Sequence, residues 1–217
     1  MTVATILSHL DPLSTTDSVG DALFELAEAH VAHLPVLDPS GHLDSIATEA
    51  ALRAHPDTDA PLGALVAGEP VSISLDTHVF DAAHVMRQHG LSVVPVLEED
   101  GSYAGLVVRS DVFGQLAHML ATEEPGAIVV LEVDRADFSL GQVAQIVEQN
   151  GVRILSVSTE DDPGAGQVRV TLKLNVTDTA RVRHVMAHYD YRVVAVFDEA
   201  EDNLQERAEA FLRYLDL

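Results

Sequence analysis

The chain has 217 residues, of which 47% are hydrophobic, so it can bury a substantial core and is not disordered over its length. Thirty-five acidic residues oppose twelve basic ones, and the formal net charge of −23 repels a phosphate backbone, which disfavours nucleic acid as a partner. Cysteine is absent, which excludes disulfides, thiolate metal sites and cysteine nucleophiles.

No apolar run approaches the roughly 18 residues that cross a bilayer, and the N-terminus lacks the basic and apolar segments of a secretion signal. We therefore expect a cytoplasmic protein that binds no membrane. The acidic residues are dispersed and Lys173 is the single lysine. This pattern resembles proteins of a high-salt cytoplasm, where the Debye length falls to about 3 Å at 1 M salt. An ordinary acidic bacterial protein is the alternative.

Residues 19–52 recur as residues 79–112 at a constant offset of 60. The identical pairs are Val19/Val79, Asp21/Asp81, Ala22/Ala82, Pro35/Pro95, Val36/Val96, Leu37/Leu97 and Gly41/Gly101. The chain therefore begins with a duplicated unit, which we call copy one (residues 1–58) and copy two (residues 59–121). A single unit of this size cannot bury both faces of its sheet, so we expect the two copies to pack on each other.

Each copy is predicted to run strand, helix, strand, turn, strand, helix. In copy one the helix begins at Val19, and a strand over 31–37 and a turn over 38–41 follow it. In copy two the predicted elements are a helix from Val79 that Gly90 ends, a strand over 91–97, a polar turn over 98–101, a strand over 103–108 and a helix over 111–120. The spacing of apolar residues gives each helix one apolar face.

Four short segments resemble the CBS motif. Residues 3–8 followed by Pro12 are similar to its beginning, the segments 34–36 and 94–96 (both aliphatic–Pro–Val) to its central strand, and residues 105–111 to its closing signature, glycine–aliphatic–x–Thr–x–x–Asp. In tandem they resemble a CBS pair, or Bateman module, over residues 1 to about 120. This resemblance implies an α+β fold made of two β-α-β-β-α units.

The resemblance also implies two clefts for adenosine-containing ligands, in which the signature Asp holds the ribose hydroxyls and the Thr lies near the ribose and phosphate. A carboxylate can accept two charge-assisted hydrogen bonds from a vicinal diol. The ligand would be regulatory, with AMP, ADP, ATP or S-adenosylmethionine as candidates, and no cofactor is required. In the second cleft the implied ligand-binding residues are Asp111 for ribose, Arg109 for phosphate, and Val108, Ser72, Val94 and Pro95.

Both copies depart from the signature. Copy two has Val108 at the Thr position, whereas copy one keeps Thr48 but has Ala51 at the Asp position and Glu49 where copy two has Arg109. The loss of a charge-assisted hydrogen bond costs about 1.5–3 kcal/mol, or roughly 10- to 150-fold in affinity. The first cleft is therefore predicted not to bind nucleotides, and the second to bind them at reduced affinity. Two alternatives are clefts filled by side chains in a module that only dimerises, and another small ligand.

Residues 122–126 form a polar boundary, and the second half then reads βαββαβ. The predicted elements are a strand over 127–133, a helix with Leu140, Val143, Ala144 and Val147 on one face, a strand over 152–158, a loop over 160–166, an alternating strand over 168–176, a helix capped by Asp178 and a strand over 193–197. This order predicts an antiparallel four-stranded sheet with both helices on one face.

The order βαββαβ over residues 126–198, with Gln149-Asn150-Gly151 after the first helix, resembles an ACT domain. Many ACT domains bind an amino acid beside a glycine in the first strand–helix loop, but here Phe138 stands at that position, which restricts the approach of a ligand. Pairing of two subunits is therefore favoured over amino-acid binding. A final helix is predicted over residues 199–217, with Leu204, Ala208, Phe211, Leu212 and Leu215 on one side.

No catalytic constellation is apparent, so we expect a protein that is not an enzyme. His184 and His188 are four residues apart on a predicted helix, but without a third ligand nearby a solvated face is favoured over a metal site. His30 and His33 flank a strand of copy one, where packing is favoured over a role in the cleft.

The whole architecture resembles bacterial CBS–ACT proteins of acetoin utilisation. It predicts a homodimeric regulator that responds to a small-molecule effector, with an unidentified protein as its possible target.

Overall fold

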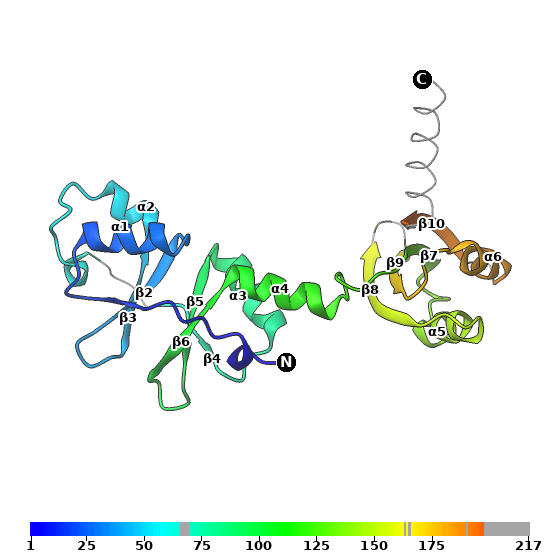
Figure 1. The fold of residues 1–217 in the computed structure, drawn as a ribbon, viewed down its shortest axis with the longest axis horizontal. Helices are drawn as coiled ribbons and strands as arrows, with labels where there is room; N and C mark the ends of the chain where they lie inside the picture. The colour runs from blue at the N-terminus through cyan, green and yellow to red at the C-terminus, as the bar shows by residue number, and fades with distance from the viewer. Residues whose placement is uncertain (66–69, 163, 165, 190, 198–217) are drawn as a thin grey trace, which may run out of the picture. The chain divides into compact units, whose positions relative to one another are not determined.

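The computed structural model describes residues 1–65, 70–162, 164, 166–189 and 191–197, which belong to two compact units, Met1–Leu116 and Ala117–Leu217 (Figure 1). The helix predicted over residues 199–217 lies outside the described residues. Within the described residues, no helix combines the length and the hydropathy that a bilayer-spanning segment needs.

The first unit contains the two predicted copies, and each holds a three-stranded sheet. Copy one comprises β1 (Leu13–Ser14), α1 (Val19–Glu28), β2 (His33–Leu37), β3 (Leu43–Thr48) and α2 (Glu49–Ala54). Copy two repeats this order as β4 (Ile73–Ser74), α3 (Val79–His89), β5 (Val93–Leu97), β6 (Tyr103–Val108) and α4 (Arg109–Met119). In both sheets the short first strand pairs in parallel with the central strand, and the third strand pairs antiparallel with it. The predicted order of elements is confirmed.

The two copies exchange their leading segments. The N–H of Val3 donates to the carbonyl of Thr77 (2.9 Å), and the N–H of Leu62 donates to the carbonyl of Asp17 (2.9 Å). Because Asp17 and Thr77 are 60 residues apart, these are the same contact made twice. Val3 and Leu62 lie in the short 3₁₀ helices η1 (Val3–Thr5) and η2 (Leu62–Ala64), and both are fully buried. Each copy therefore completes its core with the leading segment of the other copy.

Further contacts hold the copies together. Val93 and Leu106 of copy two belong to the buried cluster of copy one, and the N–H of Ser8 donates to the carbonyl of Leu106 (2.8 Å). The expectation that the two copies pack on each other is thus confirmed. Burial of apolar surface from both copies in shared clusters makes each copy dependent on the other for its stability.

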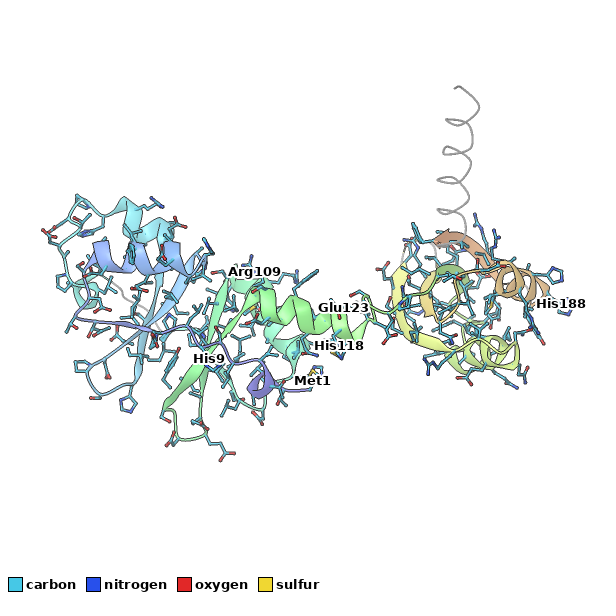
Figure 2. The ribbon with its side chains drawn as sticks, in the orientation of Figure 1. Met1, His9, Arg109, His118, Glu123 and His188 are labelled. Atoms are coloured by element: carbon cyan, nitrogen blue, oxygen red, sulfur yellow. The ribbon has the colours of Figure 1, made fainter. Side chains whose placement is uncertain are left out.

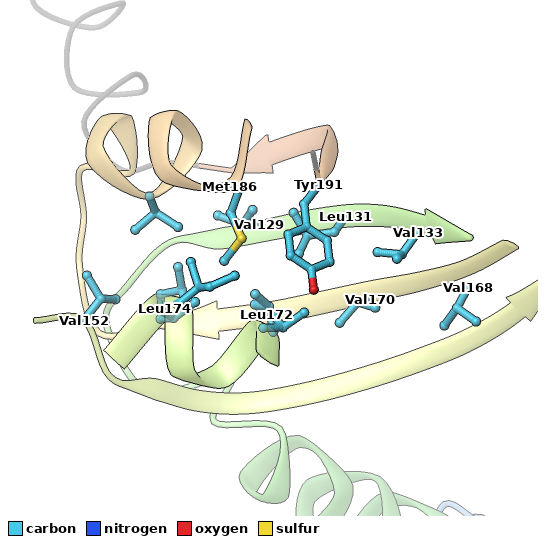
Figure 3. Close-up of a cluster of buried hydrophobic side chains, with 14 residues drawn as sticks. Val129, Leu131, Val133, Val152, Val168, Val170, Leu172, Leu174, Met186 and Tyr191 are labelled. Carbon is cyan, nitrogen blue, oxygen red and sulfur yellow. The ribbon is translucent and has the colours of Figure 1, made fainter. Parts of the chain in front are cut away.

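The second unit is a four-stranded antiparallel sheet in the order β10-β7-β9-β8. Its elements are β7 (Ile128–Asp134), α5 (Leu140–Gln149), β8 (Ile154–Asp162), β9 (Gln167–Leu174), α6 (Ala180–His188) and β10 (Arg192–Phe197). Alternate residues of β7 and β9 share one core with both helices, as Figure 3 shows, so the helices cover the same face of the sheet. This is the predicted βαββαβ arrangement.

Two local features of this unit differ from the sequence prediction. The segment predicted as a loop over 160–166 begins as part of β8, because Glu160, Asp161 and Asp162 still pair with β9 and Arg135 binds Asp161 (2.9 Å). Helix α6 has Thr179 at its N-cap, whereas Asp178 accepts a hydrogen bond from the N–H of Ala180 (2.9 Å).

Candidate functional site

Asp111 lies at the junction where β6 of copy two passes directly into α4. Val108 is the last residue of β6 and pairs with Val93, and Asp111 lies in the first turn of the helix. The carboxylate is exposed, and within the described part of the chain it forms no hydrogen bond or ion pair. A side chain at this position lies near the positive end of the helix dipole. Asp111 is thus a free anionic acceptor at a fixed place in the fold.

Three other predicted residues lie in or next to the sheet that contains Val108. Val94 and Pro95 are buried in β5, opposite Val107 and Leu106 of β6, and Ser72 immediately precedes β4. The side chain of Val94 belongs to the hydrophobic core, so it is the backbone of this strand that remains for a ligand. The structure therefore places Val108, Val94 and Pro95 in one sheet and Ser72 just before its first strand, with Asp111 in the helix that follows β6.

Arg109 is the first residue of α4 (Figure 2). Its guanidinium donates from Nε to the carbonyl of Leu91 (3.1 Å) and from Nη2 to the carbonyls of Leu91 and Gly90 (3.3 Å to the latter). Because helix residues rotate by about 100° each, Arg109 and Asp111 lie about 200° apart around α4. The two side chains predicted to hold one ligand therefore point away from each other.

Arg109 instead borders a cavity of about 510 Å³ between α3 and α4 of copy two. The lining residues are Ala83, Met86, Arg87, Gly90, Arg109, Val112, Phe113 and Leu116. Apart from Arg109, none of them was a candidate in the sequence. The one signal present is Phe113, a large aromatic residue that is 72% exposed on a helix.

The equivalent junction in copy one is occupied by its own side chains. Thr48 is the N-cap of α2, and its Oγ1 accepts the N–H of Ala51 (3.2 Å). Glu49 binds Arg53 one turn later (2.7 Å). The hydroxyl and the carboxylate at this junction thus stabilise the helix, and Ala51 supplies no acceptor for a ligand.

His33 lies between the two copies. Its Nδ1 is 3.0 Å from Oγ of Ser92 and accepts the backbone N–H of Ser92 (3.2 Å), while Oγ of Ser92 accepts the N–H of Ala32 (3.0 Å). Burial of the imidazole, and secondly the charge of Arg109, lower the pKa of His33 below its ordinary value. Because a backbone N–H can only donate, Nδ1 carries a lone pair and the neutral ring has its proton on Nε2. His33 therefore packs between the copies in its neutral form.

In the second unit, a cavity of about 440 Å³ adjoins the loop between β7 and α5. Phe138 of this loop packs against the core. Among the lining residues, Glu132 is held by Arg169 (3.3 Å) and Arg192 (3.4 Å), whereas Asp134 and Asp137 have no side-chain partner in the described part of the chain. The unpaired side chains at this cavity are therefore negative, and they repel the carboxylate of an amino acid.

The predicted solvated histidines of α6 are both exposed. His184 and His188 lie on the outer side of the helix, and among the described residues no three His, Cys, Asp or Glu side chains are close enough to hold a metal ion.

Known proteins are similar to parts of this chain. The family model of the CBS domain matches residues 62–118. A CBS domain-containing protein of Dictyostelium discoideum is 31% identical over 130 residues, which cover 52% of this chain and 87% of that protein. The A-adding tRNA nucleotidyltransferase of Aquifex aeolicus is 34% identical over 99 residues, 44% of this chain, and the match covers 12% of that enzyme.

Among solved structures, a CBS domain pair/ACT domain protein from Thermotoga maritima superposes with a TM-score of 0.51 at 20% identity, over 56% of this chain and 100% of that chain. A likeness at this identity concerns the fold.

Proposed function

The chain belongs to the CBS domain-containing proteins, and we propose that it is a non-catalytic regulatory protein which binds an adenosine-containing ligand at Asp111. The observation that carries this proposal is the exposed carboxylate in the first turn of α4, which has no partner among the residues that the structure describes. Such a group accepts two hydrogen bonds from the vicinal hydroxyls of a ribose. Candidate ligands are AMP, ADP, ATP and S-adenosylmethionine.

The neighbourhood of Asp111 supports one site rather than two. Copy one has Ala51 in place of Asp111, and its Thr48 hydroxyl is engaged by the N–H of Ala51. In copy two the backbone of β5 and the hydroxyl of Ser72, which immediately precedes β4, are further polar groups that a ligand can use. Arg109 is turned to the other side of α4, so the phosphate contact predicted for it is not needed in this proposal.

The output would be a rearrangement of a cytoplasmic homodimer. A ligand shifts such an equilibrium only if it binds one arrangement more tightly than the other. The second unit, which we infer to be an ACT domain, offers a surface for pairing, because Phe197 on the edge strand β10 is 64% exposed. The resemblance to acetoin-utilisation proteins suggests a pathway in which a protein target can be sought.

Thermal unfolding of the full chain in high salt tests the ligand. A nucleotide at 100 times its Kd should stabilise the protein by about 2.7 kcal/mol. Asp111→Ala should weaken the response about 10- to 150-fold in affinity. Asp81→Ala is the matched control, because it removes an exposed carboxylate from the first turn of α3 in the same copy.

An unchanged response in Asp111→Ala would refute the assignment of the site. No response to any adenosine compound in the unmodified chain would instead favour the alternative of a ligand-free dimerisation scaffold. A response to free amino acids that survives Asp111→Ala would point to the second unit as the sensor.

A further inference from the structure

The cavity between α3 and α4 is apolar at its floor. Met86 and Val112 are 2% exposed and belong to the core of copy two, and Ala83 and Leu116 pack against that core. Phe113 stands at the rim, 72% exposed. A volume of about 510 Å³ lies within the range of roughly 300–1,000 Å³ that small-molecule sites have.

The rim of this cavity is positively charged in a strongly acidic protein. Arg87 and Arg109 are two of the twelve basic residues in a chain of net charge −23. Arg87 is exposed and has no ion pair among the described residues, and Arg109 donates to carbonyls rather than to a carboxylate. Both charges are therefore uncompensated. The carbonyls of Gly90 and Leu91 also fix the guanidinium of Arg109, which lowers the entropic cost of a further contact.

Copy one lacks this combination at the equivalent positions. Sixty residues earlier, Arg87 corresponds to Ala27, Arg109 to Glu49 and Phe113 to Arg53. Glu49 and Arg53 neutralise each other (2.7 Å). The cationic rim is thus a feature of copy two alone and does not follow from the shared fold.

We propose that this cavity binds an organic anion with an apolar body, such as an aliphatic carboxylate. Its body lies on Met86, Val112 and Phe113, and its carboxylate lies at Arg87 and Arg109. The site is on the opposite side of α4 from Asp111, so it is separate from the proposed nucleotide site and can be occupied at the same time.

Titration calorimetry of the full chain with hexanoate, octanoate and 1-octanol tests this proposal. Each buried methylene contributes about fourfold in affinity, so octanoate, with two more methylenes, should bind roughly fifteenfold more tightly than hexanoate. 1-Octanol, which has the same chain without a charge, should bind more weakly than octanoate. Rising salt should weaken octanoate binding, because the two arginines are exposed to screening.

Two variants and two controls locate the site. Phe113→Ala and Arg87→Gln should each weaken octanoate binding about two- to fivefold, as an exposed contact allows. Phe24→Ala removes a similarly exposed ring, 63% exposed on α1, and Arg53→Gln removes a cation of copy one, so both should leave the affinity unchanged. Thermal unfolding verifies that each variant is folded.

Equal losses in the variants and their controls, or affinities that do not depend on chain length, would overturn the proposal. So would a cavity that a second copy of the chain covers, in which case octanoate fails to bind and Phe113→Ala shifts the mass seen by light scattering. Asp111→Ala should retain octanoate binding. That result separates the failure of this proposal from a failure of the nucleotide site.

Discussion

Copy one and copy two place equivalent residues in the same elements, yet different residues stand at the two ends of their first helices. Ser18 begins α1 with a capping box to Asp21, whereas His78, sixty residues later, begins α3 by accepting the N–H of Phe80. At the other end, His30 follows α1 with φ 53° and Gly90 follows α3 with φ 67°. The backbone is therefore the same while the chemistry that maintains it differs.

This comparison separates two kinds of position. Buried pairs such as Val19/Val79 stay apolar because the core requires it, and their exposed fractions are both 0%. The strand–helix junctions have diverged. At equivalent positions of the repeat, copy one has Ala51 and Glu49 where copy two has Asp111 and Arg109. The duplication thus keeps the fold in both halves, whereas the side chains at the strand–helix junctions differ between the copies.

The largest effect is expected at the exchanged segments. Leu62 lies near the start of copy two in the sequence but is fully buried in the core of copy one. Leu62→Ala should lower the free energy of unfolding by about 2–5 kcal/mol, because it leaves a cavity in a closed cluster. Urea unfolding measures the loss. Hydrogen exchange should show that α1 and β2 of copy one lose protection first.

The reciprocal variant sharpens this test. Val3→Ala should destabilise copy two by about 1–3 kcal/mol, because fewer methyl groups are removed. Leu120→Ala, at a residue 46% exposed, should change stability by less than about 0.5 kcal/mol. If Leu62→Ala opens copy two before copy one, the exchange of segments does not exist in solution.

A smaller effect is expected at the left-handed positions that follow α1 and α3. A Cβ at Gly90 would meet nothing within 4 Å, so Gly90→Ala should cost about 1 kcal/mol from backbone strain alone. His30→Gly should do the reverse and stabilise the protein by about 0.5 kcal/mol, because relief of strain exceeds the added entropy of the unfolded chain. Thermal unfolding measures the stability of both variants. Changes in stability of the same sign in the two variants would contradict this prediction.

Most of the fold was predictable because apolar spacing and the repeat act locally. The offset of 60 located both copies, and alternation along β9 indicated a sheet with one face in the core, as observed. The exchange of leading segments was not predictable, because Val3 and Leu62 find partners through contacts distant in sequence. The extension of β8 to Asp162 was missed for a similar reason, since its acidic residues are paired across the sheet with β9 and with Arg135.

The candidate site was predictable only in part. The signature placed Asp111 at a strand–helix junction, and the structure has it there. The helix was predicted to begin at Asp111, so Arg109 was placed before it and assigned to the same ligand. In the structure α4 begins at Arg109, and the guanidinium contacts Leu91 on the other side of the helix. The cavity beside Arg109 is formed by residues of both α3 and α4, so it can be recognised only when the packing of the two helices is known. No sequence motif indicates it.

The smallest effect concerns His33, which copy two replaces by Val93. Its pKa is lowered in the folded protein, so the stability that depends on the neutral ring is present above its ordinary pKa near 6.5 and is lost as the pH falls through the lowered folded value. Protonation of Nδ1 removes the acceptor of the Ser92 N–H and places a second cation near Arg109. His33→Asn offers an oxygen in place of Nδ1 and does not titrate. Urea midpoints between pH 7.5 and 5.5 should therefore fall more in the unmodified chain than in His33→Asn, and parallel curves would show that this contact does not sense pH.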